Sequence, residues 1–163
     1  VFAIGDITGE PMLAHKASHE GRIAAEVIAG KKGAAYDPKI IPAIVFTNPE
    51  LAWCGLTEEE AKEKDKNVKV VKFPWSASGR AVAIGENTGL TKLLIDKETE
   101  VILGGAVAGK NAGSLIPEIA LAIEMGSTAS DLSLTIHPHP TLSETIMESA
   151  ELFYGGATHY KKS

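Results

Sequence analysis

The feature that most constrains the fold of this chain is a proline-rich stretch near its C-terminus, residues 137–144, with the sequence HPHPTLSE. Each proline fixes its own φ and disfavours a helical conformation at the residue before it. His137 and His139 are therefore expected on a stiff extended arm. Thr141 and Glu144 have the T-x-x-E spacing of a capping box, which predicts that a helix begins at this point.

The arrangement of His139 and Glu144 leaves three chemical interpretations open. Glu144 can hydrogen-bond one nitrogen of His139, which fixes the tautomer and aims the other nitrogen at a substrate proton. Alternatively, Glu144 only caps backbone N–H groups while His139 packs in a loop, and spacing alone favours this simpler interpretation. The third is a metal site that uses His137 and His139, but it needs further ligands, and Cys54 is the only cysteine.

Composition and charge argue against several classes of protein. The 163 residues, 44% of them hydrophobic, suffice for one domain with a core, or for one domain plus part of another. A net charge of -5, with a short basic run only at Lys161–Lys162, argues against nucleic-acid binding. No apolar run approaches the roughly 20 residues of a membrane span. A single cysteine excludes an internal disulfide framework, which fits a reducing, cytoplasmic compartment.

The N-terminal segment is expected to be the remnant of a separate domain. Residues 1–4 are apolar and are typical of a buried parallel strand that ends in a Gly-Asp turn. Residues 12–29 carry the apolar pattern of a helix. Since the sequence begins in a strand and without a methionine, we expect a fragment of a longer protein. Residues 1–34 form the remnant, and residues 35–163 form the main domain.

The main domain is predicted to be α+β, with an antiparallel sheet and interspersed helices. Strands are expected at residues 40–47, 51–56, 68–73, 90–95 and 101–108, as two hairpins and one lone strand, with helices at 57–64, 114–125 and 145–153. The polar segment 74–81 is expected outside the core. Helix 114–125 is apolar nearly all round, so it is buried either within its own monomer or between the sheet and a second subunit.

Three motifs resemble segments of the pyridine nucleotide-disulfide oxidoreductases, and among these of dihydrolipoamide dehydrogenase. The sequences AIGD at 3–6 and MLAHKA at 12–17 resemble the end of that family's FAD domain. FPWSASGRA at 73–81 resembles a segment of its bacterial members, and HPHPTLSE at 137–144 resembles the active-site histidine stretch. A glutathione-reductase-like relative is the alternative, because glutathione reductase shares the His-Pro-Thr motif and the later acid.

The resemblance implies cofactor-binding residues in the N-terminal remnant. Asp6 would hydrogen-bond a ribityl hydroxyl of FAD, and the backbone around Met12, Leu13 and Ala14 would meet the flavin ring at a helix N-terminus. The family also uses a redox-active pair of cysteines and two glycine-rich folds for FAD and NAD, which do not occur in this sequence. The full-length parent is therefore expected to bind FAD and NAD, and the fragment to retain neither.

The resemblance also implies a catalytic pair. His139, which directly precedes Pro-Thr, would take a proton from a dihydrolipoamide thiol, because only the thiolate is a good nucleophile. Glu144 would orient His139, and His137 would be a neighbour and not the base. In this family the histidine acts across a homodimer interface, on the flavin and disulfide of the other subunit.

The function expected from the resemblance is that of the interface, or dimerisation, domain of an NAD-dependent dihydrolipoyl dehydrogenase. The parent enzyme would serve 2-oxo acid dehydrogenase complexes through their lipoyl domains, and the fragment alone would be inactive. Two alternatives from other classes remain, a non-catalytic dimerisation module and a metal-dependent hydrolase.

Overall fold

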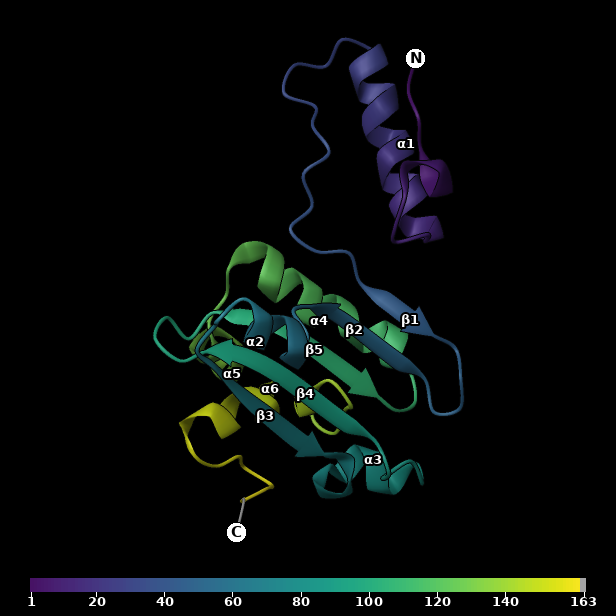
Figure 1. Ribbon diagram of the computed structural model, residues 1–163. Helices are drawn as coiled ribbons and strands as arrows, with labels where there is room; N and C mark the ends of the chain where they lie inside the picture. Colours follow the sequence, from purple (N-terminus) through teal and green to yellow (C-terminus); the bar gives the residue numbers. More distant parts are fainter. Residues whose placement is uncertain (162–163) are drawn as a thin grey trace. The chain divides into compact units, whose positions relative to one another are not determined.

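The computed structural model describes residues 1–161, so Lys162 of the short basic run lies outside the described residues. The chain divides into two compact units, Val1–Ile41 and Pro42–Ser163 (Figure 1). Within the described residues, no helix has both the length and the apolar character that a membrane span requires.

The N-terminal unit contains a short 3-10 helix, η1 (Gly5–Thr8), and one long helix, α1 (Ala14–Ile28). The prediction of a strand at residues 1–4 is wrong. A strand needs a neighbour that pairs its backbone N–H and C=O groups, and residues 1–41 include no second strand. The long helix also begins later than predicted, because Leu13 has an extended backbone and forms the N-cap.

The second unit is built on a five-stranded antiparallel sheet with the strand order β1-β2-β5-β4-β3. The strands are β1 (Ala43–Val45), β2 (Leu51–Gly55), β3 (Val68–Pro74), β4 (Leu90–Asp96) and β5 (Ile102–Ala108). The two predicted hairpins are β1–β2 and β4–β5, and the lone strand β3 pairs with β4 at the edge of the sheet. The α+β class with an antiparallel sheet is therefore confirmed.

Helices connect and cover these strands. They are α2 (Glu58–Glu63), η2 (Trp75–Ala77), α3 (Gly79–Ala83), α4 (Ala112–Met125), α5 (Ala129–Leu134), α6 (Glu144–Glu151) and η3 (Leu152–Tyr154). Helix α2 begins with the capping box of Thr57 and Glu60, and α5 begins with a similar box of Thr128 and Asp131. In such a box two backbone N–H groups at the helix end are satisfied reciprocally, so both starts are encoded locally.

Helices α4 and α6 lie on the same face of the sheet (Figure 1). Thr145 of α6 is 2.8 Å from Thr91 of β4, hydroxyl to hydroxyl. A Cβ added at Gly105 of β5 would lie 2.8 Å from a methyl group of Ile119, which belongs to α4. Gly105 pairs with Leu93, and Leu93 points to the same side as Thr91 because side chains alternate along a strand.

Helix α4 has one buried side and one open side. Ile116, Ile119, Ala122 and Ile123 are buried, whereas Leu121 and Met125 are 62% and 72% exposed. The interpretation of a helix buried wholly within its own monomer is therefore wrong. Leu121 and Met125 thus leave apolar surface uncovered on the outer side of α4, beside the exposed Glu124.

The expectation that segment 74–81 lies outside the core is also wrong. The side chains of Trp75 and Ala81 are both 0% exposed. The indole N–H of Trp75 donates to Oγ1 of Thr91 over 2.9 Å, and the ring fills space that side chains at Gly89 and Gly109 would occupy. A tryptophan can be buried where its N–H finds an acceptor, and that acceptor lies on another strand.

Candidate active site

The side chain of His139 stands in the loop before α6 and is 65% exposed. Its Nδ1 lies 2.8 Å from Oε1 of Glu144. An ionised carboxylate only accepts hydrogen bonds, so Nδ1 carries the proton and Nε2 is the acceptor nitrogen. The described residues give Nε2 no hydrogen-bond partner. This is the geometry of a base whose tautomer is held by an acid and whose other nitrogen can accept a proton.

Glu144 makes two contacts at once, one with each carboxylate oxygen. While Oε1 binds His139, Oε2 accepts the backbone N–H of Thr141 over 2.7 Å. The hydroxyl of Thr141 donates to the carbonyl of Pro138, and Ser143 is the N-cap of α6. Only one half of the predicted capping box is therefore formed. The capping and histidine-orienting interpretations of Glu144 are compatible, because each uses a different oxygen.

The charge state of Glu144 supports this arrangement. Partial burial by itself raises the pKa of Glu144, but hydrogen bonds from Thr141 and His139 favour the charged form and prevail. The charges of His139 and His159 act in the same direction, so the pKa of Glu144 lies below its ordinary value of 4.5. Glu144 is thus ionised near neutral pH, the state that keeps the proton on Nδ1 of His139.

His137 anchors the arm and has no nitrogen left for a substrate. Its Nε2 lies 2.7 Å from Oε1 of Glu118 in α4, and its Nδ1 lies 2.8 Å from the carbonyl of Thr135. The backbone bends at His139, and the two imidazoles of the arm bind different acids instead of facing one side. Within residues 1–161, no group of three or more His, Cys, Asp or Glu side chains could hold a metal ion.

A buried chain of hydroxyl groups positions the first turn of α6, which carries Glu144. The indole of Trp75 donates to Thr91, whose hydroxyl meets that of Thr145. Thr145 in turn donates to the carbonyl of Leu142 over 2.7 Å. Each hydroxyl can therefore accept one hydrogen bond and donate the next, in a single direction from η2 across β4 to α6. The Trp-containing segment thus supports the site, although sequence reasoning placed it outside the core.

Sequence reasoning missed a second histidine–carboxylate pair beside the first. Nδ1 of His159 lies 2.7 Å from Oε1 of Glu148, and its backbone N–H donates to Oε2 of the same residue over 2.9 Å. The rings of His159 and His139 are stacked, with centroids 6.2 Å apart and planes 16° apart. The i, i+4 spacing of Glu144 and Glu148 could have indicated Glu148. No local signal indicates His159, because its partner is set by the fold of the C-terminal tail.

The hydrogen bond to Glu148 and the charge of that carboxylate raise the pKa of His159 above its ordinary value of 6.5. Glu144 and Glu151 act in the same direction, and partial burial opposes them. Near neutral pH, His159 therefore carries more positive charge than an isolated histidine.

The predicted cofactor residues lie at one end of the N-terminal unit. Asp6 is exposed within η1, Met12 and Leu13 precede α1, and Ala14 is its first residue. Met12, Leu13 and Ala14 thus lie at the start of α1 and Asp6 lies in η1 of the same unit, whereas His139 and Glu144 belong to the second unit.

A buried ion pair braces the loop that carries Asp6. Lys16 and Glu20 of α1 are 6% and 9% exposed, and their charged atoms are 3.1 Å apart. Glu20 accepts the N–H of Gly5 over 2.7 Å, and Lys16 donates to the hydroxyl of Thr8 over 2.6 Å. The loop is therefore tied to the helix on both sides of Asp6.

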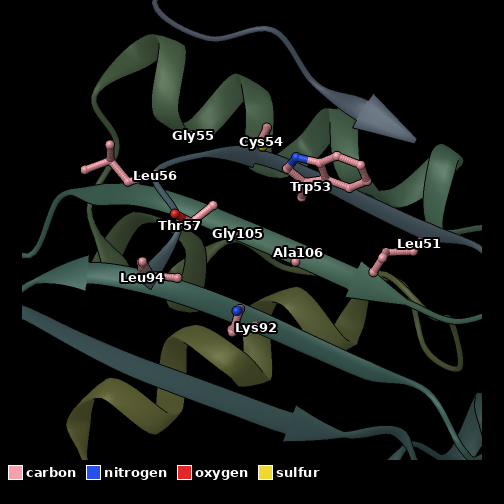
Figure 2. A pocket seen from close by; sticks show the side chains of 10 residues that line it. All are labelled: Leu51, Trp53, Cys54, Gly55, Leu56, Thr57, Lys92, Leu94, Gly105 and Ala106. Carbon is pink, nitrogen blue, oxygen red and sulfur yellow. The ribbon is translucent and has the colours of Figure 1, made fainter. Parts of the chain in front are cut away.

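A pocket of about 290 Å³ opens on the sheet face away from α4 and α6 (Figure 2). It is lined by residues of β2, β4 and β5, among them Trp53, Cys54 and Lys92. Burial raises the pKa of the Cys54 thiol to about 12, so it is not a nucleophile at neutral pH. Lys92 is paired with Glu58 at 3.0 Å. The pocket therefore offers apolar surface, and neither a base nor a reactive thiol.

Comparison with known sequences gives one family and closely similar relatives. Residues 41–150 match the family described as pyridine nucleotide-disulphide oxidoreductase, dimerisation domain. The dihydrolipoyl dehydrogenases of Haemophilus influenzae and Vibrio cholerae are 57% and 58% identical over 158 residues, which are 97% of this chain and 33% of each relative. The chain thus spans about a third of the length of the curated relatives it matches.

Comparison with solved structures gives the same kind of protein. HOCl-induced flavoprotein disulfide reductase RclA from Escherichia coli matches with a TM-score of 0.87 and 29% identity, over 93% of this chain and 35% of that protein. LpdA from Mycobacterium tuberculosis matches with a TM-score of 0.85 and 30% identity, over 93% and 33% respectively.

Proposed function

Since the chain belongs to the pyridine nucleotide-disulphide oxidoreductase family, through that family's dimerisation domain, we propose that it is the interface domain of a dihydrolipoyl dehydrogenase. The whole protein oxidises dihydrolipoamide with NAD+ for 2-oxo acid dehydrogenase complexes, whose lipoyl domain presents the substrate. The observation that carries this proposal is the His139–Glu144 pair, with its exposed ring and acceptor Nε2. The single cysteine of the chain, a buried free thiol, supports a reducing, cytoplasmic location.

In the proposed reaction His139 acts on a proton. A thiol of dihydrolipoamide transfers its proton to Nε2, and its sulfur becomes a thiolate. The thiolate attacks one sulfur of the family's redox disulfide, so an S–S bond breaks, a mixed disulfide forms, and the other cysteine leaves as a thiolate. Glu144 stabilises the imidazolium of His139 while it holds the proton.

FAD, when bound to the whole protein, carries the electron pair of the reduced disulfide on to NAD+. The residues of this chain fit a contact with that group, because Asp6 is exposed in η1 and Met12 is exposed just before the 15-residue helix α1. Asp6 supplies an acceptor for a ribityl hydroxyl, and the backbone at Met12, Leu13 and Ala14 supplies the positive end of a helix dipole. These residues form one corner of the cofactor site of the parent.

The same proposal makes the protein a homodimer through an apolar side formed by the outer side of α4, the end of α5 and the loop before His137. Leu121, Met125, Leu134 and Ile136 are 62%, 72%, 78% and 94% exposed, which is unusual for large apolar side chains. Glu118 of α4 binds His137 of the arm, so this apolar side and the catalytic arm are joined. Burial of the apolar side against a second copy presents His139 to the other subunit.

Steady-state turnover of the whole protein tests the catalytic role. His139→Gln is expected to reduce the rate with dihydrolipoamide by roughly 10²–10⁴-fold, the usual contribution of a general base. His137→Gln is the matched control and should lose far less activity, because His137 holds the arm in place and does not take the substrate proton. A normal rate for His139→Gln would contradict the catalytic role of His139. It would favour the alternative, in which this domain only dimerises and takes no part in the chemistry. A preference for glutathione disulfide as substrate would indicate the glutathione-reductase-like relative.

Light scattering over a dilution series tests the homodimer. Wild-type chain is expected to dimerise, and Leu121→Asp should weaken the dimer because it buries a charge in an apolar contact. Val82→Asp is the matched control, since Val82 is 54% exposed but belongs to α3. Equal molar masses for the two variants at every concentration would contradict the placement of the interface on α4.

A further inference from the structure

The two histidine–carboxylate pairs at α6 form one stacked cluster. His139 is bound by Glu144 at the first turn, and His159 is bound by Glu148 one turn later. Glu148 is 2% exposed, so its carboxylate is fixed in position and cannot be solvated freely. The ring that stacks on His139 is therefore held as firmly as His139 itself.

The C-terminal tail is pinned in a way that keeps His159 in place. The backbone N–H groups of Thr158 and His159 donate to Glu151 and Glu148, over 2.8 Å and 2.9 Å. The next residue, Tyr160, packs edge-to-face on Phe73 of β3, with ring centroids 6.1 Å apart. Both sides of His159 are thus attached to the folded domain.

We propose that His159 is a positioning residue for the base His139: its ring, held by Glu148, stacks on His139 and places a positive charge beside the imidazole that takes up the substrate proton. The proposal rests on the proposed function, in which Nε2 of His139 takes the thiol proton. A base that stays unprotonated at lower pH remains available for that step. His159 itself does not touch the substrate.

The charged groups around His139 determine the sign of the effect. Glu144 lies against Nδ1 and favours the imidazolium of His139. His159 faces the ring from the tail and, when protonated, opposes the imidazolium as a like charge. Glu148 and Glu151, which also belong to α6 or lie at its end, are bound to the tail and favour the charge on His159.

The pH dependence of the whole protein tests this coupling. His159→Gln keeps a hydrogen-bond donor for Glu148 but removes the positive charge. It should move the acidic limb of kcat/KM upward by about 0.5–1 pH unit, the order expected for unit charges roughly 6 Å apart near solvent. His159→Arg keeps the charge at every pH, so its acidic limb should not move upward.

A second readout follows His139 directly. A histidine ring reacts with diethylpyrocarbonate only in its neutral form. The extent to which His139 is modified at each pH, measured by mass spectrometry, therefore gives its titration midpoint without any turnover. The same upward shift is expected for His159→Gln and not for His159→Arg. An unmoved midpoint in His159→Gln, or equal shifts in both variants, would overturn the proposal. This readout stays valid if His139→Gln proves active and the proposed function fails.

Discussion

Residues 1–41 bury a pair of charges, whereas residues 42–161 bury an apolar core. In the first unit the buried side chains are Lys16 and Glu20, and Phe2 and Ile28 are 53% and 71% exposed. In the second unit large apolar side chains such as Phe73 are fully buried under α4 and α6. The first unit thus depends on hydrogen bonds and one ion pair, and the second on removal of apolar surface from water.

Two isoleucine truncations should separate the units most strongly. Ile146 is 0% exposed in α6, so Ile146→Ala should lower the free energy of unfolding by about 2–5 kcal/mol through lost burial and a cavity. Ile28→Ala removes the same atoms from a side chain that is 71% exposed, and it should change stability by less than about 0.5 kcal/mol. Denaturant unfolding followed by the amide NMR signals of each unit measures both, because Trp53 and Trp75 belong to the second unit and report on that unit alone. Equal losses of unfolding free energy in the two variants would mean that Ile28 packs into a core, although its side chain is exposed in the first unit.

The buried hydroxyl chain offers a smaller and more specific test of the second unit. Thr145→Val keeps the shape of the side chain but leaves the hydroxyl hydrogen of Thr91 without an acceptor and removes one of the two hydrogen bonds to the carbonyl of Leu142, at a cost of about 1–3 kcal/mol. The first turn of α6 should also loosen, which would weaken the hold of Glu144 on His139. Thr145→Ser retains the hydroxyl and should lose less stability. If both variants unfold alike, the hydrogen bonds contribute little and the methyl group matters more.

Acid should affect the first unit before the core of the second. The N–H of Gly5 lowers the pKa of Glu20 below its ordinary value of 4.5, with further help from Lys16 and Thr8 against the effect of burial. A lowered pKa in the folded state means that this stabilisation is complete above pH 4.5 and is lost as the pH falls through the lowered value. The amide signal of Gly5 should then shift in NMR spectra while amides of β4 stay unchanged. Glu20→Gln should abolish the shift, and a simultaneous change in β4 would contradict the comparison.

Those elements whose signals are local could be predicted from the sequence. The turn at Asn48-Pro49 gave the first hairpin, and Thr57 with acids after it gave the start of α2. The pairing of His139 with Glu144 was also within reach, because five residues of chain and the two prolines leave few geometries. In each case the interacting groups lie within one or two turns of one another.

The errors have a common cause in partners that are distant in sequence. Residues 1–4 have the composition of a strand, but a strand forms only where a neighbouring strand pairs its backbone N–H and C=O groups. Trp75 stands in a polar segment and is buried because Thr91, on another strand, accepts its N–H.

The sequence by itself determined the α+β class, the two hairpins and the helix that follows HPHPTLSE, whereas the histidine–carboxylate pair was chosen through the resemblance of that stretch to the family. Only the tertiary structure decided the strand order, the burial of Trp75, the open side of α4 and the stacking of His159 on His139. The physical reason is the range of the interactions. Turn and capping preferences act between neighbours, whereas packing and stacking depend on which distant surfaces the closed fold brings into contact.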